Sequence, residues 1–370
     1  MLHLDIDQFW ADDALAHLDN CFSKKAPQVA LGIRMSGECV FAELGEEGNP
    51  WGPIPRERRM ALHKRYNEKA KQIVGRNLLQ EVFPPEDALF PERRMIGEVF
   101  GGEYLFNGQS TWLKGSCTTP AELEAVLDRV DKLDLESFIL PENWHSEKKR
   151  IYEEYGLEPA PFTGIRGPVT LATSIFGIEN LVFLYYDAPE LYDRFSATIA
   201  DVILKYVHSY TKEAGCTEPP HGFGFADDDC CLLTPEMYER FGYPVLKKIF
   251  DTVSPLPKDL RHQHSDSAMA HLLPILGSLN LTSCNFGPTV TVTEIRKYMP
   301  NTRIDGQLAP FTFMRNNEAD IIAEVKRDCE MAKENDLRGL NLTTAGSINN
   351  GSLLTSMRTV MAAIQNYGRY

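Results

Sequence analysis

Residues 259–310 concentrate the side chains that are best suited to chemistry. His262, His264 and Asp266 are spaced two residues apart, so a β-strand would place all three on one face. Cys284 ends the next predicted strand, about 5 Å to the side if the two strands are neighbours. Imidazole, carboxylate and thiolate groups all bind metals. We therefore predict that His264, Asp266 and Cys284 hold a metal and leave one position open for a substrate.

The histidines and the cysteine also have structural interpretations. His262 is more simply explained as a core histidine whose hydrogen bonds are satisfied, whereas His264 is the better candidate for function. Cys284 is explained equally well as a ligand and as a small buried hydrophobic side chain. The predicted site therefore depends on His264.

A second group of candidates ends the run HGFGFADDDCC (221–231), where Asp227, Asp228 and Asp229 follow alternating aromatic and glycine residues. Adjacent carboxylates repel one another, so a metal, a basic substrate group or water must compensate their charge. The same residues would serve equally well as N-caps of the helix that follows. We predict that one of them, Asp228, faces the active site and acts there with His264 in catalysis.

The elements that position these groups are repeated strand–helix units. Three short runs end in polar clusters, the last at Asp305–Gln307, and a helix follows each run. Parallel strands need such crossover helices. Polar residues at the carboxyl ends of the strands mark the catalytic face of a barrel. The predicted fold is therefore an α/β (β/α)8 TIM barrel, a single domain over residues 1–370.

Two features extend this barrel. Residues 5–22 form an N-terminal helical extension, and residues 101–115 form an inserted β-hairpin with its turn at Asn107-Gly108. We interpret the hairpin as a lid or as a contact in a homodimer. Other helices are predicted for 55–75, 120–160, 180–214, 316–335 and 352–370, and other strands within 29–36, 78–84, 162–177 and 337–352.

The composition is that of an ordinary globular protein, with 370 residues, 43% hydrophobic and 24% charged. The net charge of −14 argues against a nucleic-acid partner. No apolar run approaches the ~20 residues of a membrane span, and the acidic N-terminus lacks the layout of a signal peptide. Eight scattered cysteines without a CxxC motif do not suggest a disulfide framework. We expect a cytoplasmic protein with neither a nucleic-acid nor a membrane partner.

Several motifs, in their order and spacing, resemble the uroporphyrinogen decarboxylase superfamily. They are GPVTLAT (167–173), ADD followed by LLTPEMYERF (226–241), HSDSAMAHLLPIL (264–276), NFGPTVTVTEIRKYMP (285–300) and IDGQLAP (304–310). NLTTAGSINNGS stands in the place of that superfamily's closing NLGHG-like loop. The resemblance covers residues 160–370 well and the N-terminal part loosely, and it too implies a (β/α)8 barrel.

The superfamily contains two chemistries, decarboxylation of a tetrapyrrole without a cofactor and zinc-assisted methyl transfer to or from a corrinoid protein. The decarboxylases clamp substrate carboxylates with an arginine-rich loop. This chain keeps Arg34 there, but Glu38 and Phe41 stand where further positive charge would be needed. Ser174 and Glu81 stand where those enzymes carry a tyrosine and an essential aspartate. The resemblance is therefore closer to the methyltransferases.

Relatives that act on thiols bind zinc through a His-x-Cys pair and a later cysteine. Here His264-Ser265-Asp266 and Thr343 occupy those places. A site of histidine and carboxylate is harder than a thiolate site and suits oxygen ligands. The resemblance thus implies zinc as the metal and an ether or phenol oxygen as the group to be polarised.

These inferences combine into one hypothesis. The chain would be the O-demethylase methyltransferase that moves a methyl group from a small methoxylated aromatic substrate to the cobalamin of a partner corrinoid protein. The expected substrate-binding residues are Arg34, Glu81, Phe286 and Gln307, with Phe311 as a further aromatic candidate. Two alternatives stay open: decarboxylation of a less acidic compound, and a non-catalytic barrel that acts as a scaffold or corrinoid chaperone.

Overall fold

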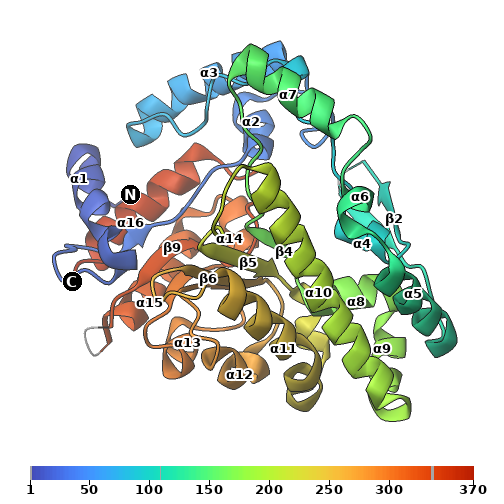
Figure 1. Ribbon diagram of the computed structural model, residues 1–370. Helices are drawn as coiled ribbons and strands as arrows, with labels where there is room; N and C mark the ends of the chain where they lie inside the picture. The colour runs from blue at the N-terminus through green and yellow to red at the C-terminus, as the bar shows by residue number, and fades with distance from the viewer. Residues whose placement is uncertain (1, 109, 335–336) are drawn as a thin grey trace. The chain divides into compact units, whose positions relative to one another are not determined.

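The computed structural model describes residues 2–108, 110–334 and 337–370 (Figure 1). The strands are β1 (Ala30–Leu31), β2 (Glu103–Phe106), β3 (Thr111–Lys114), β4 (Gly164–Arg166), β5 (Gly222–Ala226), β6 (Leu260–Ser265), β7 (Ser283–Phe286), β8 (Arg303–Leu308) and β9 (Leu340–Thr344). The longer helices are α1 (Ile6–Ala16), α2 (Gly37–Leu44), α3 (Arg56–Val74), α5 (Pro120–Lys132), α7 (Trp144–Tyr155), α8 (Pro168–Phe176), α9 (Ile178–Asp187), α10 (Pro189–Glu213), α11 (Pro235–Val253), α13 (Val292–Tyr298), α15 (Glu318–Lys333) and α16 (Leu354–Tyr367). The short ones are η1 (Leu18–Cys21), η2 (Glu86–Ala88), α4 (Ile96–Val99), α6 (Leu135–Ile139), η3 (Asp228–Leu232), η4 (Ala270–Leu272), α12 (Leu273–Gly277) and α14 (Pro310–Met314).

Within the described residues, seven strands form one sheet in the order β1-β9-β8-β7-β6-β5-β4. The pairs β1–β9, β9–β8, β8–β7 and β5–β4 are parallel, and helices connect successive strands. Strands β1 and β4 stand at the two ends of this order, so the ring of strands is not closed. The arrangement confirms the predicted α/β fold of the TIM-barrel type.

The chain divides into two compact units. Unit 1 comprises the chain up to Phe83 together with His264–Leu273 and Leu281–Tyr370, and unit 2 comprises Pro84–Gln263 and Pro274–Asn280. The division falls inside β6 rather than in a linker. The prediction of a single domain over residues 1–370 stays a prediction.

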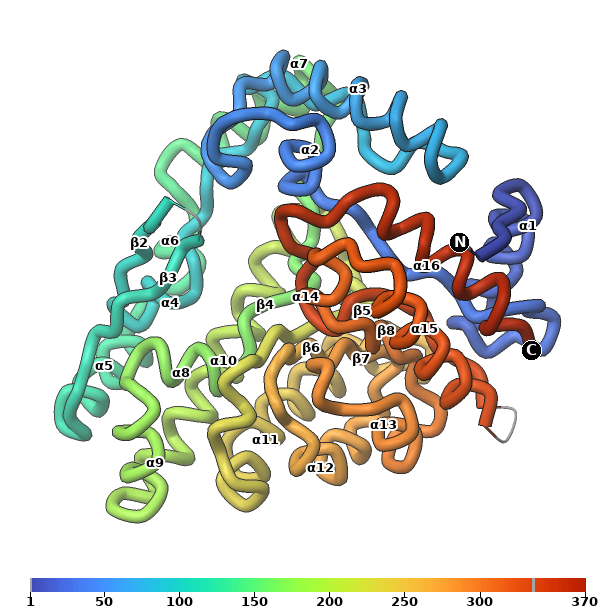
Figure 2. The backbone as a smooth tube through the Cα atoms, turned by 180° about the vertical axis from the view of Figure 1, so that it is seen from behind, coloured from blue at the N-terminus to red at the C-terminus, as the bar shows by residue number. Residues whose placement is uncertain are grey.

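Unit 1 is built around the packing of α15 against α16, which lie side by side in Figures 1 and 2. Val325 and Cys329 of α15 and Val360 of α16 are fully buried. The N-terminal segment is tied to α16, because Gln365 accepts a hydrogen bond of 2.8 Å from the backbone N–H of Asp5. Both chain ends consequently lie next to α16 (Figure 2).

Unit 2 is built around the long helix α10, which packs along α11 (Figure 1). The rings of Tyr192 and Phe241 join the two helices with centroids 4.8 Å apart. Strands β2 and β3 pair antiparallel with Tyr104 opposite Leu113. This confirms the predicted hairpin; Gln109, in its predicted turn region, lies outside the described residues.

Two strand predictions in the N-terminal part are wrong or only partly right. Residues 78–84 form no strand, because the amide of Asn67 binds their backbone instead: its Oδ1 accepts from the N–H groups of Leu78 and Leu79 at 3.0 and 3.1 Å. Within residues 29–36 only β1 is a strand. The helix predicted for 55–75 is confirmed as α3, and that for 316–335 as α15, although Asn335 lies outside the described residues.

Among the described residues, no single helix is long and apolar enough to cross a membrane. Helices α8 and α9 meet the length and composition criteria only as a pair, and the pair is bent by 98°.

Candidate active site

His264 is held in a defined orientation near the end of β6. Its Nδ1 lies 2.7 Å from Oδ1 of Asn285 on β7. The amide nitrogen of Asn285 donates to the backbone carbonyls of Thr344, at 3.0 Å, and Asp305, which fixes its oxygen toward His264. Because an amide oxygen can only accept, the ring hydrogen must lie on Nδ1. The neutral imidazole therefore carries its lone pair on Nε2, the atom that would bind a metal.

Asp266 follows β6 directly and is exposed, with a ligand atom within 4.8 Å of one on His264. Two glycines allow neighbouring loops to approach it. A Cβ on Gly287 would lie 2.4 Å from the backbone oxygen of Asp266, and one on Gly346 would lie 2.9 Å from its Cβ. The structure thus brings together two of the three predicted metal ligands, His264 on β6 and Asp266 on the loop for which two glycines leave room.

Cys284, the third predicted ligand, is not presented to this pair. It is fully buried, and burial raises the pKa of its thiol far above the usual range. It precedes Asn285, whose side chain reaches His264, and consecutive strand residues point to opposite faces. Cys284 therefore points away from His264 and fits the interpretation of a buried hydrophobic residue.

His262 lies on β6 two residues before His264 and is half-buried. Its ring and Cβ stand over Gly224 of β5, where an added Cβ would lie 3.4 Å from the Cβ of His262. This packing agrees with the structural interpretation of His262.

In unit 2, Asp227 is fully buried at the start of α8. Its Oδ1 accepts a hydrogen bond of 2.7 Å from the backbone N–H of Thr170, and its Oδ2 is buried without a hydrogen-bond partner. Burial raises the pKa of this carboxyl to about 7, although the hydrogen bonds from α8 oppose the shift. Gly167 makes room for it, since a Cβ there would lie 2.1 Å from the Cβ of Asp227.

The other two aspartates of the triplet differ from Asp227. Asp229 is half-buried, accepts a hydrogen bond from the hydroxyl of Thr173, and donates its backbone N–H to Thr170 Oγ1 at 3.0 Å. Asp228 begins η3 and is also half-buried. The alternative that the triplet caps the following helix is wrong, because Thr234 caps α11. Asp227 instead accepts its hydrogen bond from the first turn of the preceding helix α8.

The four predicted substrate-binding residues fall into two groups. Phe286 is fully buried, and Gln307 is 1% exposed with its Nε2 donating to the backbone oxygens of Gly287 and Val290. Both side chains are packed inside the structure, and their predicted role in substrate binding stays a prediction. Arg34 is exposed after β1, and Glu81 is half-buried and accepts from the amide of Asn67 at 2.8 Å.

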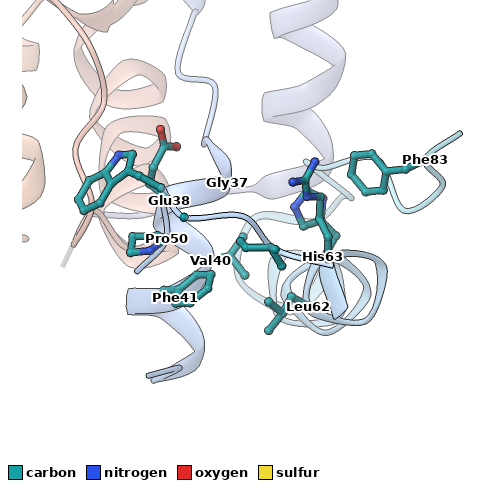
Figure 3. Close-up of a pocket in the computed structure, with 12 residues that line it drawn as sticks. Gly37, Glu38, Val40, Phe41, Pro50, Leu62, His63 and Phe83 are labelled. Carbon is teal, nitrogen blue, oxygen red and sulfur yellow. The ribbon is translucent and has the colours of Figure 1, made fainter. Parts of the chain in front are cut away.

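A pocket of about 320 Å³ lies within residues 37–83 of unit 1 (Figure 3). His63 and Phe83 form one side of it, with ring centroids 5.3 Å apart, and Glu38 stands on the other. Neither Arg34 nor Glu81 lines the pocket. Their predicted role in substrate binding stays a prediction.

Sequence reasoning missed two residues that matter for the site. Asn285 was noted only as the first residue of the motif at 285–300, yet a polar amide between a cysteine and a phenylalanine at a strand end signals a hydrogen-bonding role. Asp227 was grouped with its acidic neighbours, and nothing in the sequence separates the buried carboxylate of the three from the others.

Comparison with known proteins identifies relatives. The profile of the family described as uroporphyrinogen decarboxylase (URO-D) matches residues 147–367. A similar solved structure is a methyltransferase from Methanosarcina mazei, with a TM-score of 0.52 and 16% sequence identity, over 83% of this chain and 86% of that one. A sequence comparison with characterised proteins found no match. At 16% identity the structural likeness concerns the fold.

Proposed function

Since the chain belongs to the uroporphyrinogen decarboxylase family, we propose that it is an enzyme of the methyl-transferring kind. The proposed reaction moves a methyl group from a methoxylated aromatic substrate to the cob(I)alamin of a partner corrinoid protein. The likeness to a methyltransferase supports the reaction class. The observation that carries the proposal is the oriented His264 beside Asp266 at the carboxyl end of β6.

The residues present fit a divalent metal such as zinc in part. The hydrogen bond from Nδ1 of His264 to Asn285 leaves the lone pair of the neutral ring on Nε2, where a metal could bind. Asp266 offers an exposed carboxylate beside it. A metal bound there would act as a Lewis acid toward an ether oxygen. Catalytic zinc needs three protein ligands, and within unit 1 the described residues supply this pair. We propose His264 and Asp266 as ligands and leave Cys284 out.

Demethylation of an aryl ether requires stabilisation of the negative charge on the departing phenolate, which is a poor leaving group. The carbon–oxygen bond breaks with its electron pair left on oxygen, and the methyl carbon bonds to the cobalt nucleophile. A positioned acid can then supply the proton that converts the phenolate to the phenol. We propose Asp228 for this role, because it follows β5, the neighbour of β6 in the strand order, and the carboxyl ends of barrel strands share one face.

The test mixes the purified, zinc-loaded protein with a reduced corrinoid protein and 4-methoxyphenol. We expect methylcobalamin, followed by its absorbance, only when all components are present. His264→Ala should lower the rate at least ~100-fold, since it removes a metal ligand, and zinc content measured in parallel should fall with it. Asp228→Asn should lower the rate and leave the zinc content unchanged.

The matched control is His145→Ala, which removes an exposed histidine of α7 and should alter neither the rate nor the zinc content. If no methoxylated, methylamine or thiol donor ever yields methylcobalamin, the proposal is wrong. If methylcobalamin forms equally well with His264→Ala, methyl transfer is supported but the proposed site at His264 is wrong.

Family membership also favours a second candidate, decarboxylation of a small compound less acidic than a tetrapyrrole. That reaction needs neither a metal nor a partner protein. Release of carbon dioxide by the protein alone, in the presence of a chelator, would identify it. A protein active in neither assay would point to a scaffold or a corrinoid chaperone.

A further inference from the structure

A second cavity lies entirely within unit 2 and has no part in the proposed site. Its volume is about 410 Å³, within the range of small-molecule pockets. Hairpin β2–β3, strand β4 and helix α10 all contribute to its walls. Tyr104 and Thr111 come from the hairpin, Arg166 from β4, and Tyr206 and Tyr210 from α10.

One wall of this cavity is a preformed cluster of aromatic rings. Phe162, which precedes β4, lies with its centroid 4.8 Å from that of Tyr210 and 5.8 Å from that of Tyr206. The hydroxyl of Tyr206 donates to the backbone oxygen of Arg94 at 3.0 Å, and the guanidinium of Arg93 lies 3.6 Å from the centroid of Tyr210. These contacts hold the rings in place, so a flat ligand ring could stack without reordering them.

The cavity also contains a cation that lacks a carboxylate partner. Arg166 is half-buried, and its Nη1 donates to Ser174 Oγ at 3.3 Å. No carboxylate forms an ion pair with Arg166 in the part of the chain that the structure describes. A second arginine, Arg94, lines the cavity with a half-exposed side chain 3.9 Å from Glu98. A partly desolvated guanidinium in this state favours an anionic ligand, which it can bind through two parallel hydrogen bonds.

Tyr104 adds a neutral hydrogen-bond donor beside Arg166. Its hydroxyl oxygen accepts from the backbone N–H of Gly97 at 3.2 Å, so its own hydrogen can point elsewhere. Burial raises the pKa of Tyr104, although nearby Arg166 opposes the shift, and the phenol stays protonated at neutral pH. The hairpin thus brings a donor to the same cavity as the unpaired guanidinium.

From these walls we infer that the cavity binds an aromatic carboxylate. The ring stacks against Phe162 and Tyr210, and the carboxylate accepts hydrogen bonds from Arg166 and Tyr104. The hairpin, interpreted from the sequence as a lid or a dimer contact, is then a wall of a ligand site. The inference requires neither a metal nor His264, so it stands or falls separately from the proposed methyl transfer.

The experiment measures binding of 4-methoxybenzoate to the full chain by calorimetry at neutral pH. Two analogues separate the contributions: 4-methoxybenzamide keeps the ring without the charge, and cyclohexanecarboxylate keeps the charge without the aromatic ring. We expect each analogue to bind at least ~10-fold more weakly than the probe, because a charge-assisted pair and ring stacking each contribute that much. Failure of the folded protein to bind the probe, or equal binding of the amide, overturns the inference.

Variants locate the site. Arg166→Gln should weaken binding ~10- to 100-fold, and Arg166→Lys should weaken it less, since the charge remains but the paired donors are lost. The matched control is Arg194→Gln, an arginine of α10 paired with Asp128 and Asp131 on the surface, which should leave the affinity unchanged. Tyr104→Phe should weaken binding several-fold and tests the site if Arg166→Gln does not fold.

Two outcomes separate this inference from the proposed reaction. His264→Ala should bind the probe as the natural protein does, even where methyl transfer is lost. If Arg166→Gln and Arg194→Gln bind the probe equally, the cavity is not the binding site, whatever the result of the methyl-transfer assay.

Discussion

Acidic residues follow both β5 and β6, yet the two strand ends use them in opposite ways. After β5, Asp227 is fully buried and accepts a hydrogen bond from the start of α8. After β6, Asp266 is exposed beside the oriented ring of His264. Each aspartate is approached by a glycine, Gly167 in the first case and Gly287 in the second. The same sequence signal therefore serves the fold at one strand end and is available to a ligand at the other.

The difference teaches that an acidic residue at a strand end is not by itself a functional assignment. What separates the two is the partner. Asp227 meets the partial positive charge at the N-terminus of α8. Asp266 stands near an imidazole whose lone-pair atom is set by Asn285. Four measurements would break or sharpen this contrast.

The largest expected effect is a pH dependence of stability that comes from Asp227. Its pKa is about 7 in the folded protein and about 4 in an unfolded chain, so between these values the folded state retains a proton that the unfolded state has lost. The free energy of unfolding should therefore fall as the pH rises from 4 to 7, by about 4 kcal/mol. In Asp227→Asn this decrease of the free energy of unfolding with rising pH should be absent.

Urea unfolding of both proteins between pH 4.5 and 7.5 checks this. The difference between the two slopes isolates Asp227, because other groups with raised pKa values, such as His17 and Asp328, contribute to both proteins equally. Parallel curves would mean that Asp227 is ionised in the folded protein.

The two glycines should respond differently to a methyl group. Gly167→Ala places a Cβ 2.1 Å from the buried Asp227 and should destabilise the protein by about 3 kcal/mol. Gly287→Ala places a Cβ 2.4 Å from the backbone oxygen of Asp266, so the backbone that carries Asp266 must move. We expect about 2 kcal/mol of destabilisation together with loss of zinc affinity, whereas Gly167→Ala should leave the zinc affinity unchanged. Gly37→Ala, with no atom within 4 Å of the new Cβ, is the control. Equal loss of zinc affinity in Gly167→Ala and Gly287→Ala would remove the contrast.

Asn285→Ala tests whether the orientation of His264 matters. It removes the acceptor for Nδ1, so zinc affinity should fall ~10- to 100-fold while the fold persists. Competition with a chromogenic chelator measures the affinity. Asn143→Ala, an exposed asparagine before α7, should behave as the natural protein does. Unchanged zinc affinity in Asn285→Ala would show that the ring needs no support.

The smallest effect is expected from Cys284→Ala. This substitution trims a buried side chain, so stability should fall by about 1 kcal/mol, and zinc content should not change. Elemental analysis of the purified variant measures the zinc. A loss of zinc would restore Cys284 as a ligand and contradict its direction away from His264.

Much of the fold was predictable because it follows from local pattern. The runs that lead to His264, Asn285 and Gln307 are short, end in polar clusters and are followed by helices. They form strands β6, β7 and β8 of one sheet, in which β7 and β8 are parallel. The same reasoning wrongly predicted a strand at residues 78–84. Apolar content indicates burial, but it cannot show that the side chain of Asn67 accepts the hydrogen bonds of this backbone.

The candidate site was less predictable, since burial and direction depend on contacts distant in sequence. His264 and Asp266 were found because they are two residues apart in the sequence, so their proximity is local. The direction of the Cys284 side chain depends on which residues of β7 lie on the same face of the sheet as His264, and strand register decides that. Phe286 and Gln307 look available at the end of a strand, but the structure buries them.

The amide of Asn285 has a consequence for how this protein tolerates substitutions. The Asn285 side chain, on β7, joins the ring of His264 on β6 to the main-chain oxygens of Asp305 on β8 and Thr344 on β9. Its hydrogen bonds therefore form only when these four strands are correctly aligned. A small displacement of any of these strands, without a change of register, would turn the imidazole away while the hydrophobic core still formed. Inactive yet folded variants should therefore arise from substitutions that disturb strand alignment far from any substrate.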